Sequence, residues 1–172
     1  MDVMWSPWRS KYIQTFKDEE KKEEDKECIF CRAARDPNRD DELFVVNRNE
    51  NCFVIQNKYP YNNGHIMIAP YEHVGDIDDL EDRVLLEMMK TVKDTKNILS
   101  ELYNPHGFNI GINLGRVAGA GVPGHVHIHI VPRWNGDTSF MPVFADVKVV
   151  SVSLEESQKM LSHEFKKLKQ KR

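Results

Sequence analysis

The sequence predicts an α+β fold, in which helices pack on an antiparallel sheet. The first observation behind this prediction is the order of elements, since three strand-like segments precede one long amphipathic segment and two more follow it. The second is the stretch of residues 125–131, where histidines alternate with aliphatic residues as they do on a strand with two different faces. This combination is typical of a sheet that buries one face beneath helices.

Three strands are predicted in the first half of the chain, at residues 43–47, 52–56 and 65–69. Each of these short segments is dominated by apolar residues, many of them β-branched or aromatic, and is bounded by turn-forming residues. The four residues between the first two strands, Arg48-Asn49-Glu50-Asn51, favour a turn because asparagine readily adopts turn conformations. The sequence therefore places the first two strands next to each other as a hairpin.

A long helix is predicted at residues 78–103, because apolar residues recur there at steps of three and four. Asn104-Pro105 ends this helix, since proline cannot continue it. Two further strands are predicted after it, at residues 108–114 and at residues 125–131. The second of these carries the histidines.

Three regions are expected along the chain. Residues 1–27 form an N-terminal arm that ends in a run of charged residues, which suits a solvated helix or a linker. Residues 28–141 form the compact domain. Residues 142–172 form an extension that packs on this domain, with a weak strand at residues 148–152 and a helix that begins at Ser153.

The composition is that of one ordinary globular domain. At 172 residues, 40% of them hydrophobic, the chain can bury a sizeable core. No apolar run approaches the roughly 18 residues of a membrane span, and the first residues do not resemble a signal peptide. The formal net charge of −3 provides no basic footprint for nucleic acid, so neither nucleic acid nor membrane is an expected partner. Three cysteines without a disulfide pattern favour the reducing cytoplasm.

The chemistry of the chain is expected at His125, His127 and His129. On a strand these side chains share one face, and neighbours lie about 6.6 Å apart at the usual rise per residue. Imidazole acts near neutral pH as a nucleophile, a proton carrier or a metal ligand. A purely structural role explains three such residues poorly, since each buried imidazole needs its own polar partners. A simple metal site stays open, because two imidazoles two residues apart can chelate one ion.

A glycine-rich segment leads directly into the histidine strand. Five of the nine glycines of the chain fall within residues 111–124. Glycine permits positive φ and lets backbone N–H groups approach a ligand closely, which is how many loops bind phosphate. Flexible loops are also rich in glycine, so the segment is informative mainly because it adjoins the histidines. Together the two features favour a site for an anion.

These residues resemble the signature of a known family. His125-Val-His127-Ile-His129-Ile-Val131 is similar to the defining motif of the histidine triad family of nucleotide hydrolases and transferases. Asn57, followed by Gly64-His65-Ile66-Met67-Ile68-Ala69-Pro70, resembles the first block of that family. Residues 111–134, together with Trp5-Ser6-Pro7-Trp8-Arg9, resemble the branch that contains bacterial diadenosine tetraphosphate phosphorylases.

The resemblance implies a five-stranded antiparallel sheet that is extended across a homodimer. It also implies that neutral His127 attacks the α-phosphate of a nucleotide and forms a nucleotidyl-histidine. A neighbouring backbone carbonyl is expected to orient His127, and His129 is expected to bind the phosphate oxygens. His125 completes the catalytic triad, and His65 is the fourth histidine of the family, which supports the reacting one.

Further contacts to the nucleotide are expected around the glycine-rich segment. By resemblance Asn57 contacts the ribose, although its place at a strand end also suits a turn residue. Arg116 is either a phosphate clamp or an exposed loop cation, and Trp134 either covers the site or packs at an edge. The remaining expected contacts are the amide side chain of Asn113 and the backbone amides of Gly119, Gly121 and Gly124.

A zinc site is implied by the same resemblance. Some bacterial members of the family bind zinc through a Cys-x-x-Cys pair and two histidines, which here are Cys28, Cys31, His73 and His125. This donor set suits tetrahedral zinc in a structural role. The alternative is two buried thiols beside a histidine at the surface. A divalent cation that accompanies the nucleotide substrate is a second expected cofactor.

Three functions are compatible with these features. The leading one is an enzyme that cleaves dinucleoside polyphosphates of the diadenosine tetraphosphate type by nucleotidyl transfer through His127, with inorganic phosphate as the acceptor. The second is a hydrolase of nucleotides or nucleoside phosphoramidates. The third is a zinc-stabilised nucleotide-binding module without turnover, which the intact triad, His65 and the glycine-rich segment disfavour.

Overall fold

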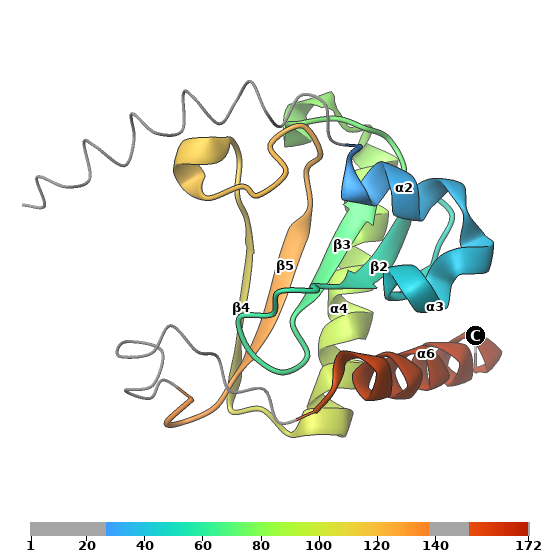
Figure 1. The fold of residues 1–172 in the computed structure, drawn as a ribbon, viewed down its shortest axis with the longest axis vertical. Helices are drawn as coiled ribbons and strands as arrows, with labels where there is room; N and C mark the ends of the chain where they lie inside the picture. The colour runs from blue at the N-terminus through green and yellow to red at the C-terminus, as the bar shows by residue number, and fades with distance from the viewer. Residues whose placement is uncertain (1–26, 138–151, 172) are drawn as a thin grey trace, which may run out of the picture.

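A five-stranded antiparallel sheet forms the centre of the protein (Figure 1). The computed structural model describes residues 27–137 and 152–171. The strands lie in the order β1, β2, β3, β5, β4, and every neighbouring pair is antiparallel. Their bounds are β1 (Val45–Arg48), β2 (Cys52–Gln56), β3 (Ile66–Pro70), β4 (Gly107–Ile112) and β5 (Ile128–Arg133). The predicted α+β fold with a five-stranded antiparallel sheet is therefore confirmed.

Two long helices cover one face of this sheet. They are α4 (Asp82–Tyr103), which passes behind the sheet in Figure 1, and α6 (Leu154–Gln170). Both are amphipathic, so each buries one apolar stripe and leaves the opposite side in water. Their stripes meet the sheet in one hydrophobic core, to which α4 contributes Met88, α6 contributes Phe165, and the strands contribute Ile66 and Ile128.

Two short helices cover half of the opposite face. They are α2 (Ile29–Arg35) and α3 (Asp40–Leu43), and the 3-10 turn η1 (Pro37–Arg39) joins them. They pack on β1, β2 and β3 through a second core, in which Phe30 and Phe53 are fully buried. Among the described residues this core takes none from β4 or β5. The histidine-bearing half of the face is thus left for a site.

Several elements differ from the sequence prediction. β3 and β4 differ from their predicted bounds by one or two residues at each end. The first strand begins at Val45, because residues 40–43 form α3 and Phe44 adopts a left-handed conformation with φ of 59°. The long helix begins at Asp82, since the chain first makes the 3-10 turn η2 (Ile77–Asp79). Helix α2 has no counterpart in the prediction, because its seven residues are too few to show a clear apolar period.

The histidine segment joins the sheet later than predicted. β5 begins at Ile128, and Val126 donates its N–H to the carbonyl of Val74 at 2.7 Å instead of to a neighbouring strand. The alternation nevertheless holds, because Val126, Ile128 and Ile130 all belong to the core beneath α4 and α6. The three histidines between and beside them are therefore directed toward the other face.

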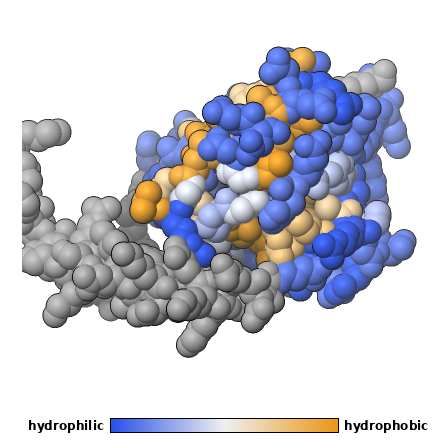
Figure 2. Space-filling model, turned by 90° about the horizontal axis from the view of Figure 1, so that it is seen from above, coloured by the Kyte–Doolittle hydropathy of each residue, from blue (hydrophilic) through white to orange (hydrophobic). Residues whose placement is uncertain are grey.

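Several expectations concern segments outside the described residues. These are the N-terminal arm with its Trp5-Ser6-Pro7-Trp8-Arg9 motif and the weak strand at residues 148–152. Within the described ranges, no helix is long and apolar enough to cross a lipid bilayer. The end of the molecule seen in Figure 2 is mainly hydrophilic, with apolar residues exposed in places.

Candidate active site and metal cluster

His127 is held by a hydrogen bond to the backbone of its own segment. Its side chain is buried, with 4% of the residue exposed, and its Nδ1 lies 2.8 Å from the carbonyl oxygen of His125. A carbonyl oxygen only accepts hydrogen bonds, so Nδ1 carries the hydrogen and donates it. The other ring nitrogen, Nε2, then has a lone pair and no hydrogen. This tautomer is the one that a nucleophilic imidazole requires.

A second pair of histidines lies beside it, and its tautomers are also determined by the backbone. The N–H of Tyr61 donates to Nδ1 of His65 at 3.1 Å, so Nε2 of His65 carries the hydrogen. That nitrogen donates to Nδ1 of His129 at 2.9 Å. Nε2 of His129 therefore carries a hydrogen of its own. The rings of His127 and His129 are edge to face, with centroids 4.7 Å apart. The ring with a lone pair on Nε2 therefore lies beside the ring with a hydrogen on Nε2.

Burial keeps these imidazoles neutral. Desolvation lowers the pKa of His129 to about 4, and the neighbouring His127 adds to the effect. Desolvation also lowers the pKa of His127, although the hydrogen bond to the carbonyl of His125 opposes this shift. Near neutral pH both rings are uncharged, so His127 keeps its lone pair and His129 remains a neutral donor.

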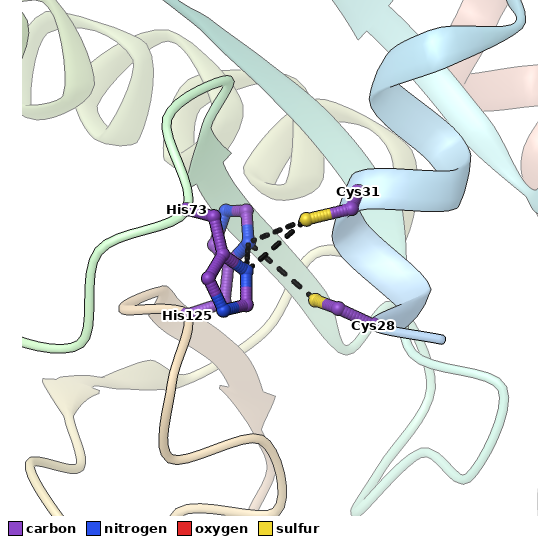
Figure 3. Close-up of side chains that lie close together, drawn as sticks. All are labelled: Cys28, Cys31, His73 and His125. Carbon is purple, nitrogen blue, oxygen red and sulfur yellow. Dashed lines mark hydrogen bonds between the residues drawn. The ribbon is translucent and has the colours of Figure 1, made fainter. Parts of the chain in front are cut away.

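Four possible metal ligands gather where α2 begins, next to the start of the histidine segment (Figure 3). Their ligand atoms all lie within 4.8 Å of one another, and the residues are Cys28, Cys31, His73 and His125. The sequence analysis expected these four residues to come together, although they span almost 100 positions of the chain. The tight grouping has to be compared with the geometry of a zinc ion.

Three of four separations between the ligand atoms are close to those of a tetrahedron around zinc, and the fourth, between Cys31 and His73, is shorter. The two histidine Nδ1 atoms are 3.3 Å apart, and Sγ of Cys31 lies 3.1 Å from Nδ1 of His73. Nδ1 of His125 lies 3.5 Å from Sγ of Cys28 and 3.7 Å from Sγ of Cys31. At usual zinc–ligand lengths, a tetrahedron separates two nitrogens by about 3.3 Å and a nitrogen from a sulfur by about 3.6 Å.

A hydrogen bond behind His125 orients its ring for such a role. Its Nε2 lies 3.0 Å from the carbonyl oxygen of Pro70 and must donate to it. The lone pair of His125 is therefore on Nδ1, the atom that faces the cysteines. Metal-binding histidines are commonly oriented by a carbonyl in this way. Burial lowers the pKa of His125 to about 4, which also keeps this nitrogen available.

The glycine-rich segment forms the loop between β4 and β5, with the 3-10 turn η3 (Arg116–Ala118) in its middle. Gly119 has φ of 91°, a conformation that favours glycine, and its amide donates to the carbonyl of Arg116 at 2.8 Å. The loop itself therefore uses this amide. The amides of Gly121 and Gly124 donate no hydrogen bond within the described part of the chain. A side chain at Gly124 would lie 3.2 Å from Nε2 of His73, so glycine lets the loop pass close to the metal cluster.

The remaining nucleotide-binding candidates are distributed around this centre. Asn57 has a turn role, because its Oδ1 accepts a hydrogen bond from the N–H of Tyr59 at 2.9 Å. Asn113 lines a cavity beside His129 and donates through Nδ2 to the carbonyl of Gly119 at 3.3 Å. Arg116 is half-buried in η3. Trp134 is half-buried where β5 ends and is not part of the cavity wall.

Sequence reasoning missed three side chains of the site. Phe30 packs between the two buried histidines, with ring centroids 5.1 Å from His125 and 4.6 Å from His127. Tyr61 stacks on His65, with ring centroids 4.7 Å apart. Asp137 accepts hydrogen bonds at the far end of the cavity. The aromatic residues around Pro60, between Asn57 and His65, were a signal for Tyr61, whereas no sequence pattern pointed to Asp137.

A cavity of about 510 Å³ opens beside His129 on the uncovered half of the sheet. Its floor includes Val131 of β5 and Gly111 of β4, and Tyr61 and Arg133 contribute to its walls. The volume lies in the range of binding sites for small molecules, roughly 300 to 1,000 Å³. His129, which bonds to His65 and lies beside His127, thus adjoins a space that a substrate can enter.

Comparison with known proteins agrees with this geometry. The HIT domain model matches residues 38–136. A protein named AP-4-A phosphorylase from Mycobacterium tuberculosis is 31% identical over 177 residues, which cover 94% of this chain and 83% of that protein.

Solved structures share the fold. A hypothetical histidine triad nucleotide-binding protein from Sulfolobus tokodaii is 29% identical, with a TM-score of 0.66 over 84% of this chain and 95% of that one. A Zn-bound histidine triad family protein from Mycobacterium smegmatis is 26% identical, with a TM-score of 0.66 over 84% of this chain and 97% of that one. Because the family model spans more than half of the sequence and the mycobacterial relative nearly all of it, this chain belongs to the HIT domain family.

Proposed function

We propose that the protein cleaves dinucleoside polyphosphates by transferring a nucleotidyl group through His127. The observation that carries this proposal is the hydrogen bond from Nδ1 of His127 to the carbonyl of His125, which leaves Nε2 as the nucleophilic atom. The similarity to the mycobacterial AP-4-A phosphorylase supports this class of substrate. The buried, neutral imidazoles of His127 and His129 suit such chemistry.

The proposed reaction has two displacements. In the first, Nε2 of His127 forms a bond to the α-phosphorus while the bond from that phosphorus to its bridging oxygen breaks. The electron pair leaves with the departing nucleoside polyphosphate, and the hydrogen on Nε2 of His129 is placed to bind the departing oxygen. In the second, an acceptor oxygen attacks the same phosphorus, the nitrogen–phosphorus bond breaks, and His127 is regenerated.

Several groups are available to bind the charged oxygens. They are the side chain of Asn113 and the backbone amides of Gly121 and Gly124, and Arg116 lies on the same loop. Such preorganised donors stabilise the charge that develops in the transition state. We propose that Asn57 contacts the ribose and that Trp134 adds a contact at the margin of the site. A divalent cation is proposed to accompany the polyphosphate.

Inorganic phosphate is the proposed acceptor. The motifs that favour it are Asn113 with the Gly115–Gly124 loop and Pro132-Arg133-Trp134. A phosphate acceptor needs an anion site near the leaving group, and the loop amides with Asn113 or Arg116 provide suitable donors. The alternative is a hydrolase, in which water is the acceptor and no such anion site is needed.

The metal cluster is proposed to hold one structural zinc ion. Support comes from the close grouping of the four ligand atoms and from the Zn-bound neighbour from Mycobacterium smegmatis. Such an ion would bind the start of α2 to the histidine segment and so would stabilise the segment that carries the nucleophile. The proposed location is the cytoplasm, whose reducing conditions would keep the cysteines of the metal cluster available as ligands.

A homodimer remains part of the proposal. β4 is an edge strand of the described sheet and pairs only with β5. It exposes Ile110 and Ile112, with 46% and 38% of each residue accessible. An exposed apolar edge is suited to pairing with a second copy of the same strand, which would extend the sheet across the dimer.

The first prediction concerns the nucleophile. His127→Ala should lower the turnover of diadenosine tetraphosphate by at least about a thousandfold, because no other side chain replaces Nε2 in covalent catalysis. Steady-state kinetics measures this loss, and an alkaline quench should trap radiolabelled nucleotide on the wild type alone. His163→Ala is the matched control, since His163 is exposed on α6. Near-normal turnover by the His127 variant would refute the assignment.

The second prediction identifies the acceptor. With diadenosine tetraphosphate and millimolar phosphate, the products should be ADP and ATP, because phosphate adds to the transferred AMP unit. Chromatography of the nucleotides measures the ratio of ADP to AMP. If AMP and ATP dominate even at high phosphate, water is the acceptor and the protein is a hydrolase.

The third prediction concerns the metal. Protein purified without chelators should contain about one zinc per chain by elemental analysis. His73→Ala should lose this zinc and lower the melting temperature, since a structural metal contributes its binding free energy to folding. His106→Ala is the control, because His106 is also exposed but lies outside the cluster. Metal-free wild-type protein would contradict the zinc proposal.

The fourth prediction concerns assembly. Sedimentation equilibrium should show a dimer for the wild type, and Ile112→Glu should weaken it at least about tenfold by placing a charge in the paired edge. Leu86→Glu serves as the control, because Leu86 is exposed on α4, away from that edge. A wild-type monomer, or equal dimerisation of both variants, would exclude the β4 interface.

A further inference from the structure

The cavity beside His129 has a feature that catalysis through His127 does not itself require. Gly111 pairs directly with His129 across β4 and β5, so both residues face the same side of the sheet. A Cβ built on Gly111 would meet no atom within 4 Å, and its φ is not in the left-handed region. The backbone there does not need glycine. Glycine at this position leaves open space next to His129, whose Nε2 carries a hydrogen.

The chemistry of the proposed reaction determines what enters this space. In a displacement at phosphorus the attacking and leaving atoms lie roughly in line. Nε2 of His127 attacks from one side, where Phe30 packs against the buried ring. The departing oxygen must then be on the opposite side, within reach of Nε2 of His129. The group attached to that oxygen extends into whatever open space adjoins His129.

The cavity extends along β5 far enough for a nucleotide. Arg133 lies four residues after His129 on the same strand, a separation of about 13 Å at the usual rise per residue. Val131 forms apolar floor between the two. A phosphate chain near His129 and Asn113 would thus leave room for a nucleoside toward the far end.

The far end carries groups suited to a nucleoside. Tyr61 stacks on His65 and is 57% exposed, so it contributes an aromatic ring to the cavity wall, and such rings suit contact with a nucleoside base. Arg133 is fixed by Asp137, to which Nε and Nη2 donate at 2.6 and 2.9 Å, and its Nη1 donates to Asn109 at 2.6 Å. Since a guanidinium has five N–H groups, two remain for a ligand.

We propose that this cavity is the subsite for the departing half of the substrate, a nucleoside polyphosphate, and that Gly111 keeps the subsite open. The inference rests on the proposed nucleotidyl transfer. It also places the acceptor, because the second displacement is in line with His127 as well. The acceptor phosphate therefore enters the space that the departing nucleotide leaves.

The test compares two valine substitutions, one in the cavity and one outside it. Gly111→Val would project a branched side chain into the cavity beside His129. Lys93→Val is the control, because Lys93 is exposed on α4 and lies outside the cavity lining. Gly107 cannot serve, since it pairs with Arg133 at the far end of the cavity. Thermal melting and sedimentation of both variants check that fold and assembly are retained.

Two substrates with the same transferred AMP unit separate the subsite from the histidines. For diadenosine tetraphosphate, Gly111→Val should lower kcat/KM at least about tenfold. For adenosine 5′-phosphoramidate, whose leaving group is only ammonia, the same variant should stay within about twofold of the wild type. Lys93→Val should change neither by more than that. Equal losses on both substrates, or no loss on either, would overturn the proposal.

A binding measurement makes the result independent of turnover. ATP is titrated calorimetrically into enzyme already saturated with AMP, which fills the site of the transferred nucleotide. The wild type and Lys93→Val should bind ATP under these conditions, and Gly111→Val should bind it at least about tenfold more weakly. Equal binding by all three proteins, or no binding by the wild type, would refute the subsite. Failure of the wild type to cleave diadenosine tetraphosphate would instead refute the proposed function.

Discussion

The hydrogen bond from His127 to the carbonyl of His125 is the interaction on which the rest of the site depends. It joins residues two positions apart, so it is formed by the local extended backbone and requires no distant partner. One bond determines which nitrogen of His127 has the lone pair. His125 also directs its side chain to the cysteines, so a single residue serves the metal cluster through its ring and the nucleophile through its backbone.

The sheet makes this arrangement stable by separating its two faces. The helix-facing side of the histidine segment is anchored by Val126 and Ile128 in the main core, which lets buried imidazoles occupy the other side without exposing apolar surface. Hydrogen bonds compensate for the burial, since His65, His125 and His127 each bond to a backbone group. Burial lowers the pKa of His125, His127 and His129 and so keeps these rings neutral, which is the protonation state that the proposed chemistry uses.

The parts of the structure that follow from local patterns could be predicted from the sequence. The alternation at residues 125–131 predicts which side chains share a face, and the apolar period at residues 78–103 predicts the long helix. Resemblance to a family predicted that Cys28 and His73 belong to one site, although no local rule relates residues so far apart. In the structure the ligand atoms of these residues, with those of Cys31 and His125, lie within 4.8 Å of one another.

Other parts depend on long-range packing that no local pattern describes. Phe30 reaches the histidines only because α2 folds over β2 and β3, and that short helix has too few residues to be recognised. The bond from Asn62 to Asp137 joins a loop before β3 to the end of β5 and depends on the strand order. The space beside Gly111 is likewise visible only once β4 lies next to β5.

The two-residue repeat of the histidine segment also limits how this protein can change during evolution. Inserting or deleting a single residue between His125 and Ile130 would exchange the two faces beyond that point, so imidazoles would enter the main core and aliphatic side chains would line the site. Both the stability of the fold and its chemistry would be lost in one event. We therefore expect length variation to be tolerated in the loop before Val126, where the chain is not yet paired in the sheet, and to be selected against within the strand itself.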